Sequence, residues 1–186
     1  MNRRDAVQYI SLLLGGTIVG GNAFLTGCKS NTGIQAKFSA DDIAYLDEIA
    51  NTILPDTSTP GAKAAMVGQF MTVMINDSYE EKDQKIFHDG MNKLNDLSKK
   101  TYSNSFMKIN DLQRHELLVK LDQEQKDYMK NKKKEEPSHY FRMMKELTML
   151  GYFTSEIGCT KARRYVETPG KYEGCIPYKK GDKAFA

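Results

Sequence analysis

The chain has 186 residues, of which 27 are lysine or arginine and 24 are aspartate or glutamate, so its formal net charge at pH 7 is +3. This length fits one ordinary domain. Charges of both signs are interspersed and no basic face emerges, so nothing in the sequence calls for a nucleic-acid partner.

The N-terminal end of the chain has the layout of a bacterial export signal. It begins with Arg3 and Arg4, and the segment from Ala6 to Cys28 then contains no charged side chain. This segment ends in Leu-Thr-Gly-Cys, which resembles the lipobox of bacterial lipoproteins. The resemblance implies that residues 1–27 are a signal peptide and that Cys28 becomes the acylated first residue. We therefore expect a periplasmic lipoprotein that is held at a membrane by its lipid anchor.

A permanent transmembrane helix is the alternative for this segment, and such a helix needs about 20 predominantly apolar residues. The apolar run is diluted by Gly15, Gly16, Thr17, Gly20, Gly21 and Asn22, so we favour a cleaved signal. The paired arginines and the weak hydrophobicity also suit twin-arginine export, which carries folded proteins. The neighbouring residues depart from the twin-arginine pattern, so general secretory export stays open.

Residues 28–38 are mostly polar, which predicts a short flexible tether in front of a folded domain over residues 39–186. In this domain, apolar residues recur every three or four positions, which is the period of an amphipathic helix. The first helix is expected to begin after Ser39, whose side chain suits an N-cap, and to end at Pro55.

Three further helices are expected along the middle of the chain. The second has an apolar stripe made of Ala64, Val67, Phe70, Met71, Met74 and Ile75. The third is expected to begin at a capping box formed by Ser78 and Glu81, and the fourth begins near Asn110. Strand-type alternation is missing from the sequence. The pattern therefore predicts an all-α fold, an irregular bundle of about five helices.

The fifth helix is expected to carry Pro137 in its first turn and apolar groups on most sides. It is either the central core helix or a core helix whose far side another protein covers. The tail after Tyr165 contains Pro169, Gly170, Gly174 and Pro177, which predicts an irregular, non-helical segment.

Two cysteines remain once Cys28 is assigned to the lipid. Cys159 and Cys175 are an even pair in a compartment that permits disulfides, with fifteen residues between them. A disulfide that closes such a loop could stabilise the fold by about 3 kcal/mol in the chain-entropy model. Two free thiols are the alternative.

Residues for catalysis or for binding a metal ion are scarce. His88, His115 and His139 are too far apart to place two metal ligands on one helix face, and no metal site is expected. No phosphate-binding glycine loop and no nucleophile elbow occur. Glu156 is the one acid within an apolar stretch, where burial would raise its pKa. A structural role for Glu156 is favoured, and a self-sufficient enzyme is not supported.

Three stretches, taken together and in order, resemble a known family. They read Ile49-Ala-Asn-Thr-Ile-Leu-Pro-Asp-Thr-Ser-Thr-Pro-Gly-Ala62, then Leu147-Thr-Met-Leu-Gly-Tyr-Phe-Thr-Ser-Glu156, and then Pro169-Gly-Lys-Tyr-Glu-Gly-Cys-Ile-Pro177. They are similar to the small subunit, often called subunit 3, of membrane-associated gluconate 2-dehydrogenase complexes.

The resemblance implies a non-catalytic accessory subunit that binds no cofactor itself. In such complexes a larger flavoprotein of the glucose-methanol-choline oxidoreductase class binds FAD and oxidises a sugar or polyol, and a cytochrome c often takes the electrons. The flavoprotein commonly leaves the cytoplasm bound to the small subunit. We expect the fifth helix and the tail to form much of the docking surface, with the aromatic side chains that anchor interfaces supplied by Tyr152, Phe153, Tyr172 and Tyr178.

Two other classes of function remain as alternatives. The chain could be a stand-alone periplasmic binding lipoprotein, in which case no flavoprotein would be encoded beside it. It could also be a hydrolase or isomerase that uses Glu156, in which case the purified chain alone would be active. The substrate of a complex, whether gluconate, glucose or a glycoside, stays open.

Overall fold

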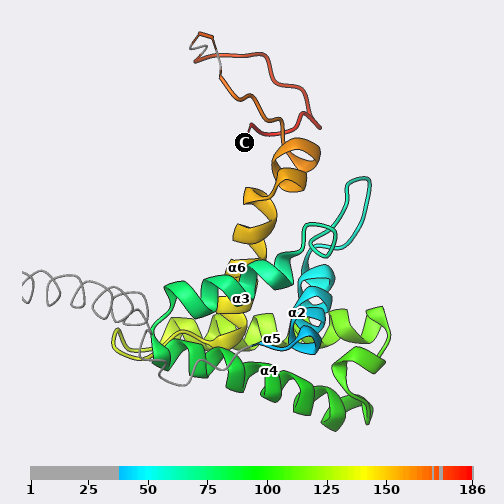
Figure 1. The fold of residues 1–186 in the computed structure, drawn as a ribbon, viewed down its shortest axis with the longest axis vertical. Coiled ribbons are helices and arrows are strands. Elements are labelled where there is room, and N and C mark those ends of the chain that lie inside the picture. The colour runs from blue at the N-terminus through cyan, green and yellow to red at the C-terminus, as the bar shows by residue number, and fades with distance from the viewer. Residues whose placement is uncertain (1–37, 169, 172–173, 186) are drawn as a thin grey trace, which may run out of the picture. The chain divides into compact units, whose positions relative to one another are not determined.

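The computed structural model describes residues 38–168, 170–171 and 174–185 (Figure 1). The expected signal peptide, Cys28 and the tether up to Lys37 lie outside the described residues, as does Tyr172. The described residues contain five α-helices and no strand, which confirms the all-α prediction. The α-helices are α2 (Ala40–Ile53), α3 (Val67–Ser78), α4 (Glu81–Tyr102), α5 (Asp111–Asn131) and α6 (Tyr140–Thr154). A short 3-10 helix, Phe106–Lys108, precedes α5, and a π-helix, Gly158–Ala162, follows α6.

The N-termini of α2 and α5 are fixed by capping boxes. Before α2, the Ser39 hydroxyl accepts the backbone N–H of Asp42 at 3.2 Å, and the Asp42 carboxylate accepts the backbone N–H of Ser39 at 2.9 Å. Asn110 and Gln113 form the same reciprocal pair before α5. Because each pair satisfies two backbone donors that the helix leaves free, the two starts expected from the sequence are confirmed.

Two other expected helix starts are wrong. Ser78 forms no capping box with Glu81, because Ser78 is the last residue of α3, and α4 begins at Glu81 without a side-chain cap. Helix α3 also begins later than its apolar stripe suggests, since residues 62–66 form turns and Met66 has a positive φ of 53°.

Pro137 does not lie in the first turn of α6. The helix begins at Tyr140, and the Nδ1 atom of His139 accepts the backbone N–H of Phe141 at 3.2 Å, so histidine is the N-cap. The Tyr128 hydroxyl of α5 donates to the carbonyl of Pro137 at 3.0 Å. This bond holds Pro137 in the connection between α5 and α6.

Helix α6 is the central core helix. It contacts α2, α3, α4 and α5 (Figure 1). Its Phe141, Met144 and Leu147 side chains are buried in the core. Gly151 allows α3 to approach closely, because an added Cβ would lie 2.6 Å from the Phe70 ring. Of the apolar residues on α6, only Met149 and Leu150 are largely exposed. The domain itself therefore covers most of this helix, as the core interpretation predicts.

Candidate docking surface

Helix α6 ends in a compact turn built by Ser155. Its hydroxyl donates to the carbonyl of Tyr152 at 2.7 Å and accepts the backbone N–H of Gly158 at 3.0 Å. Only glycine fits at 158, since an added Cβ would lie 1.9 Å from the Tyr152 oxygen. The chain continues as the π-helix, a rare element that is often found at functional sites.

The aromatic residues that were expected at the docking surface differ in their exposure to solvent. Tyr152 is only 5% exposed, and its hydroxyl donates to the carbonyl of Pro60 at 2.7 Å. It therefore ties α6 to the linker between α2 and α3, and it is not exposed for docking. Phe153 is half-buried beneath the Arg163 guanidinium, 4.5 Å from the ring centroid. Tyr178 is 74% exposed, and Tyr172 lies outside the described residues.

Glu156 is exposed to solvent, so the expectation that an apolar stretch buries it is wrong. The apolar pattern continues past Thr154, but the regular helix ends there and the pattern no longer predicts which side chains are buried. Cys159 is half-buried and its thiol donates to the carbonyl of Phe153 at 3.3 Å, while Cys175 is exposed. Both thiols are free in this structure, and their disulfide stays a prediction.

The described part of the tail is closed at its base by Arg164 and Phe185. The backbone N–H of Arg164 donates to the carbonyl of Ala184 at 2.8 Å, and its guanidinium lies 3.9 Å from the centroid of the Phe185 ring. Nearby, the Lys183 ammonium donates to the carbonyl of Lys161. The tail thus turns back to its own starting point and carries exposed apolar side chains: Tyr165, Val166, Ile176, Tyr178 and Phe185. Their exposure makes the tail a candidate interface.

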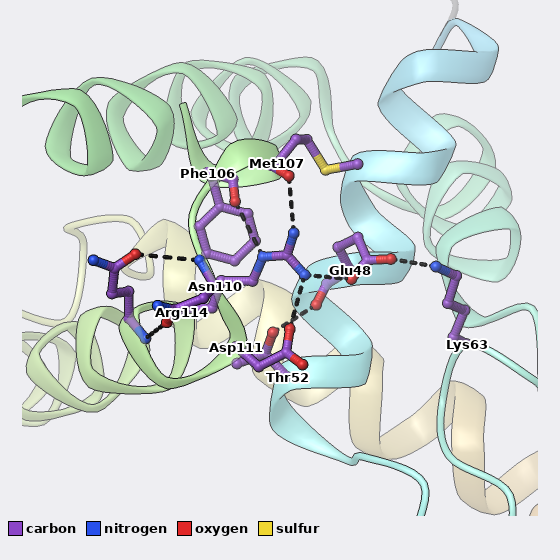
Figure 2. Close-up of polar contacts among 9 residues, drawn as sticks. Glu48, Thr52, Lys63, Phe106, Met107, Asn110, Asp111 and Arg114 are labelled. Carbon is purple, nitrogen blue, oxygen red and sulfur yellow. Dashed lines mark hydrogen bonds and ion pairs between the residues drawn. The ribbon is translucent and has the colours of Figure 1, made fainter. Parts of the chain in front are cut away.

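The most extensive polar network lies elsewhere, around Arg114 of α5 (Figure 2). The guanidinium donates to the carbonyls of Phe106 and Met107 at 3.1 and 2.9 Å. It also pairs with Glu48 of α2 at 2.8 Å and with Asp111 at 3.3 Å. The side chains of Arg114 and Glu48 are 12% and 14% exposed.

Lys63 completes this network by pairing with Glu48 from the linker side (Figure 2). Its hydrogen bond and charge interaction with Glu48 raise the pKa of Lys63. The network links α2, the α2–α3 linker, the 3-10 helix and the start of α5. Since its charged groups already satisfy one another, it stabilises the fold and offers no free group to a ligand.

Asp122 and His139 also have structural partners. Burial opposes ionisation of Asp122, but hydrogen bonds from Lys126 and Lys145, together with the charge of Lys145, lower the pKa of Asp122 to about 2. A groove of about 420 Å³ contains His139, whose pKa is lowered by burial although Glu124 opposes the shift. The Nδ1 atom of His139 accepts the backbone N–H of Phe141, so the neutral imidazole caps the N-terminus of α6.

In the described part of the chain, no group of three or more His, Cys, Asp and Glu side chains could hold a metal ion. Across the same residues, none of the helices combines the length and apolar character needed to cross a bilayer.

Sequence reasoning did not find the contact between Arg164 and Phe185 or the network of Arg114. Both join residues far apart in the chain, and no periodicity or short motif marks such pairs. The PGKYEGCIP stretch was the only available signal, and it pointed to the tail without giving its geometry.

The family model of gluconate 2-dehydrogenase subunit 3 matches residues 40–170. The match begins with the first residue of α2 and includes every described α-helix, the π-helix and the start of the tail. No curated protein and no solved structure matches the chain significantly.

Proposed function

The chain belongs to the gluconate 2-dehydrogenase subunit 3 family, and on this premise we propose that it is the non-catalytic small subunit of a periplasmic sugar or polyol dehydrogenase complex. Its partner is a flavoprotein of the glucose-methanol-choline class, which binds FAD and carries out the oxidation. A cytochrome c subunit accepts the electrons. The small subunit stabilises the flavoprotein, accompanies it during export and anchors it at the membrane.

The observation that carries this proposal is the group of exposed apolar side chains on one irregular segment, the tail. Most of the core helix α6 is covered by its own domain, and the charged groups around Arg114 satisfy one another. The tail instead exposes Tyr165, Ile176, Tyr178 and Phe185. Exposed apolar groups on an irregular segment are typical of a surface that another protein covers. We place the flavoprotein on the tail and on Phe153 at the end of α6.

Export and anchoring depend on the N-terminal segment. Acylation of Cys28 would attach the domain to the membrane, and a single acyl chain binds only marginally, so the two or three chains of a bacterial lipoprotein are needed. Paired arginines suit the export of a complex that has folded in the cytoplasm, because twin-arginine transport accepts folded cargo. The flavoprotein would then need no signal of its own.

The test is to express the tagged full-length chain together with the flavoprotein encoded beside it. A yellow complex with flavin absorbance should purify through the tag, and deletion of the small subunit should leave the flavoprotein in the cytoplasm. If the chain purifies alone and the flavoprotein reaches the periplasm without it, a stand-alone lipoprotein becomes the better description.

The docking surface is tested with a matched pair of substitutions. Tyr178→Asp places a charge on the tail, whereas Leu112→Asp places one on an equally exposed apolar position of α5. Both variants should keep their helical circular dichroism. Only Tyr178→Asp should lower the yield of complex, and equal yields for the two variants would place the interface elsewhere.

A further inference from the structure

Residues 174–185, the last described stretch of the chain, form a distinct exposed structure that we call the terminal arm. It consists of a limb without helix or strand over residues 174–178, a turn over residues 179–182 and an end that returns to Arg164 (Figure 1). Chain ends are usually poorly ordered unless something holds them. Here the backbone bond between Arg164 and Ala184 and the ring contact of Phe185 hold the end in place.

The turn of the terminal arm presents positive charge. The backbone N–H of Lys179 donates to the Asp182 carboxylate at 2.8 Å, and the N–H of Asp182 donates back to the carbonyl of Lys179 at 3.0 Å. Gly181 has a φ of 98°, which side-chain-bearing residues rarely adopt. Asp182 is therefore engaged in closing the turn. Lys179 and Lys180 are both exposed, and neither forms an ion pair with another described residue.

The limb, residues 174–178, forms no hydrogen bond with any other described part of the chain. In an extended segment, side chains two residues apart share a face, and the N–H and C=O groups of those residues share an edge. When the limb is extended along a partner strand, Ile176 and Tyr178 therefore present two apolar side chains on one face and two amides on one edge, and no other described residue pairs with these amides. Pro177, which has no N–H, belongs to the opposite edge, and proline is tolerated there in an edge strand.

We propose that the terminal arm binds the dehydrogenase subunit by adding its limb, residues 174–178, as an edge strand to an exposed sheet edge that is flanked by acidic residues. This inference rests on the proposed function and adds the mode of docking and the chemistry of the partner surface. The partner edge pairs with the backbone of Ile176 and Tyr178, while its carboxylates pair with Lys179 and Lys180.

The limb favours a protein edge over a lipid surface as its partner. An unpaired extended backbone needs an ordered row of donors and acceptors, which a strand edge supplies at matching spacing. The hydrocarbon of a bilayer offers no such groups. Lysines beside aromatic residues also occur at membrane surfaces, so binding to anionic vesicles serves as the competing outcome in the test.

The charge part is tested in the full-length complex with Lys179→Glu/Lys180→Glu and the control Lys133→Glu/Lys134→Glu. The control reverses two neighbouring exposed lysines in the loop between α5 and α6. The arm variant should weaken binding to the flavoprotein by about tenfold and flatten its dependence on salt, because two ion pairs become repulsive. The control should bind like the wild type.

The strand part is tested by replacing Tyr178 with alanine and with proline. Alanine removes only the side chain, whereas proline also removes the N–H that faces the partner, so proline should weaken binding by about a further tenfold. Hydrogen exchange of the complex should show protection of the Ile176 and Tyr178 amides and none of the Cys175 amide. Equal binding of the alanine and proline variants, or no protection, would overturn the strand mode.

The two proposals fail in different ways. If the wild-type complex forms and all arm variants bind normally, the arm inference is wrong and the subunit function stands. If no complex forms with the wild-type chain, both are wrong. If the charge-reversed arm instead loses binding to phosphatidylglycerol vesicles while flavoprotein binding is unchanged, the arm is a membrane contact.

Discussion

Replacing Arg114 with alanine should destabilise the domain strongly, although Arg114 lies outside the candidate docking surface. The change removes the donors to the Phe106 and Met107 carbonyls and one partner of Glu48 (Figure 2). Breaking a buried ion pair costs about 3–5 kcal/mol. Lys63 still pairs with Glu48, and both charged side chains keep some contact with water, so we expect a loss of about 2–3 kcal/mol.

The assay is urea unfolding of the domain followed by circular dichroism. For Arg114→Ala the midpoint should fall while the slope with denaturant stays unchanged, because the exposed area of the unfolded chain is similar. Arg114→Lys should lose less, since it retains the charge but not the fork that reaches two carbonyls. As a control, Lys82→Ala breaks a fully exposed pair with Glu80 and should leave the midpoint unchanged. A midpoint for Arg114→Ala equal to that of the control would refute the assigned role.

Four other predictions can be checked independently. Tyr152→Phe should cost about 1 kcal/mol in urea unfolding through loss of the bond to the Pro60 carbonyl, without reducing flavoprotein binding. Because the pKa of Asp122 is lowered to about 2 from an unfolded value of about 3.9, its contribution is present above pH ~4 and is lost as the pH falls towards 2. The shift corresponds to at most ~2.5 kcal/mol, which solvent screening reduces to ~1 kcal/mol, and Asp122→Asn should remove that part of the acid destabilisation in a pH series of unfolding curves. Cys28→Ser should move the protein from the membrane to the soluble periplasm or leave it unprocessed, and a processed variant that stays on the membrane would contradict lipidation. Non-reducing mass spectrometry of the exported protein should find Cys159 linked to Cys175, and two alkylatable thiols in that sample would exclude the bridge.

Features whose bonding groups lie close together in the sequence were predictable from it, and contacts between distant residues were not. The caps at Ser39 and Asn110 were predictable because all the bonding groups lie within four residues. The start of α3 was not, because its cap comes from another helix, where the Asp47 carboxylate accepts the backbone N–H of Gly68 at 2.7 Å. No residue pattern near Gly68 marks that bond.

The same limit explains the error at Tyr152. Its position in an over-apolar helix suggested an exposed anchor, yet the side chain crosses to a linker residue 92 positions earlier in the chain. A buried tyrosine needs a partner for its hydroxyl, and the Pro60 carbonyl supplies it. The sequence shows that Tyr152 is amphipathic, but it does not show where a compatible carbonyl lies. Tyr165 and Tyr178 of the tail stay exposed, and no other described residue offers their hydroxyl groups a hydrogen bond.

The tether sets how far a lipid-anchored domain can stand from the membrane. Phe38, the first described residue of the domain, lies ten positions after Cys28, and a fully extended chain over ten positions spans about 35 Å. If Cys28 is acylated, Phe38 stays within that distance of the lipid surface, and the domain is held near the membrane at this point. In the proposed complex, a tether of this length would keep the flavoprotein close to an electron acceptor in the membrane. Lengthening it by about twenty Gly/Ser residues should preserve flavin oxidation by a soluble acceptor and slow electron transfer to the membrane, because the effective concentration of the acceptor falls with linker length.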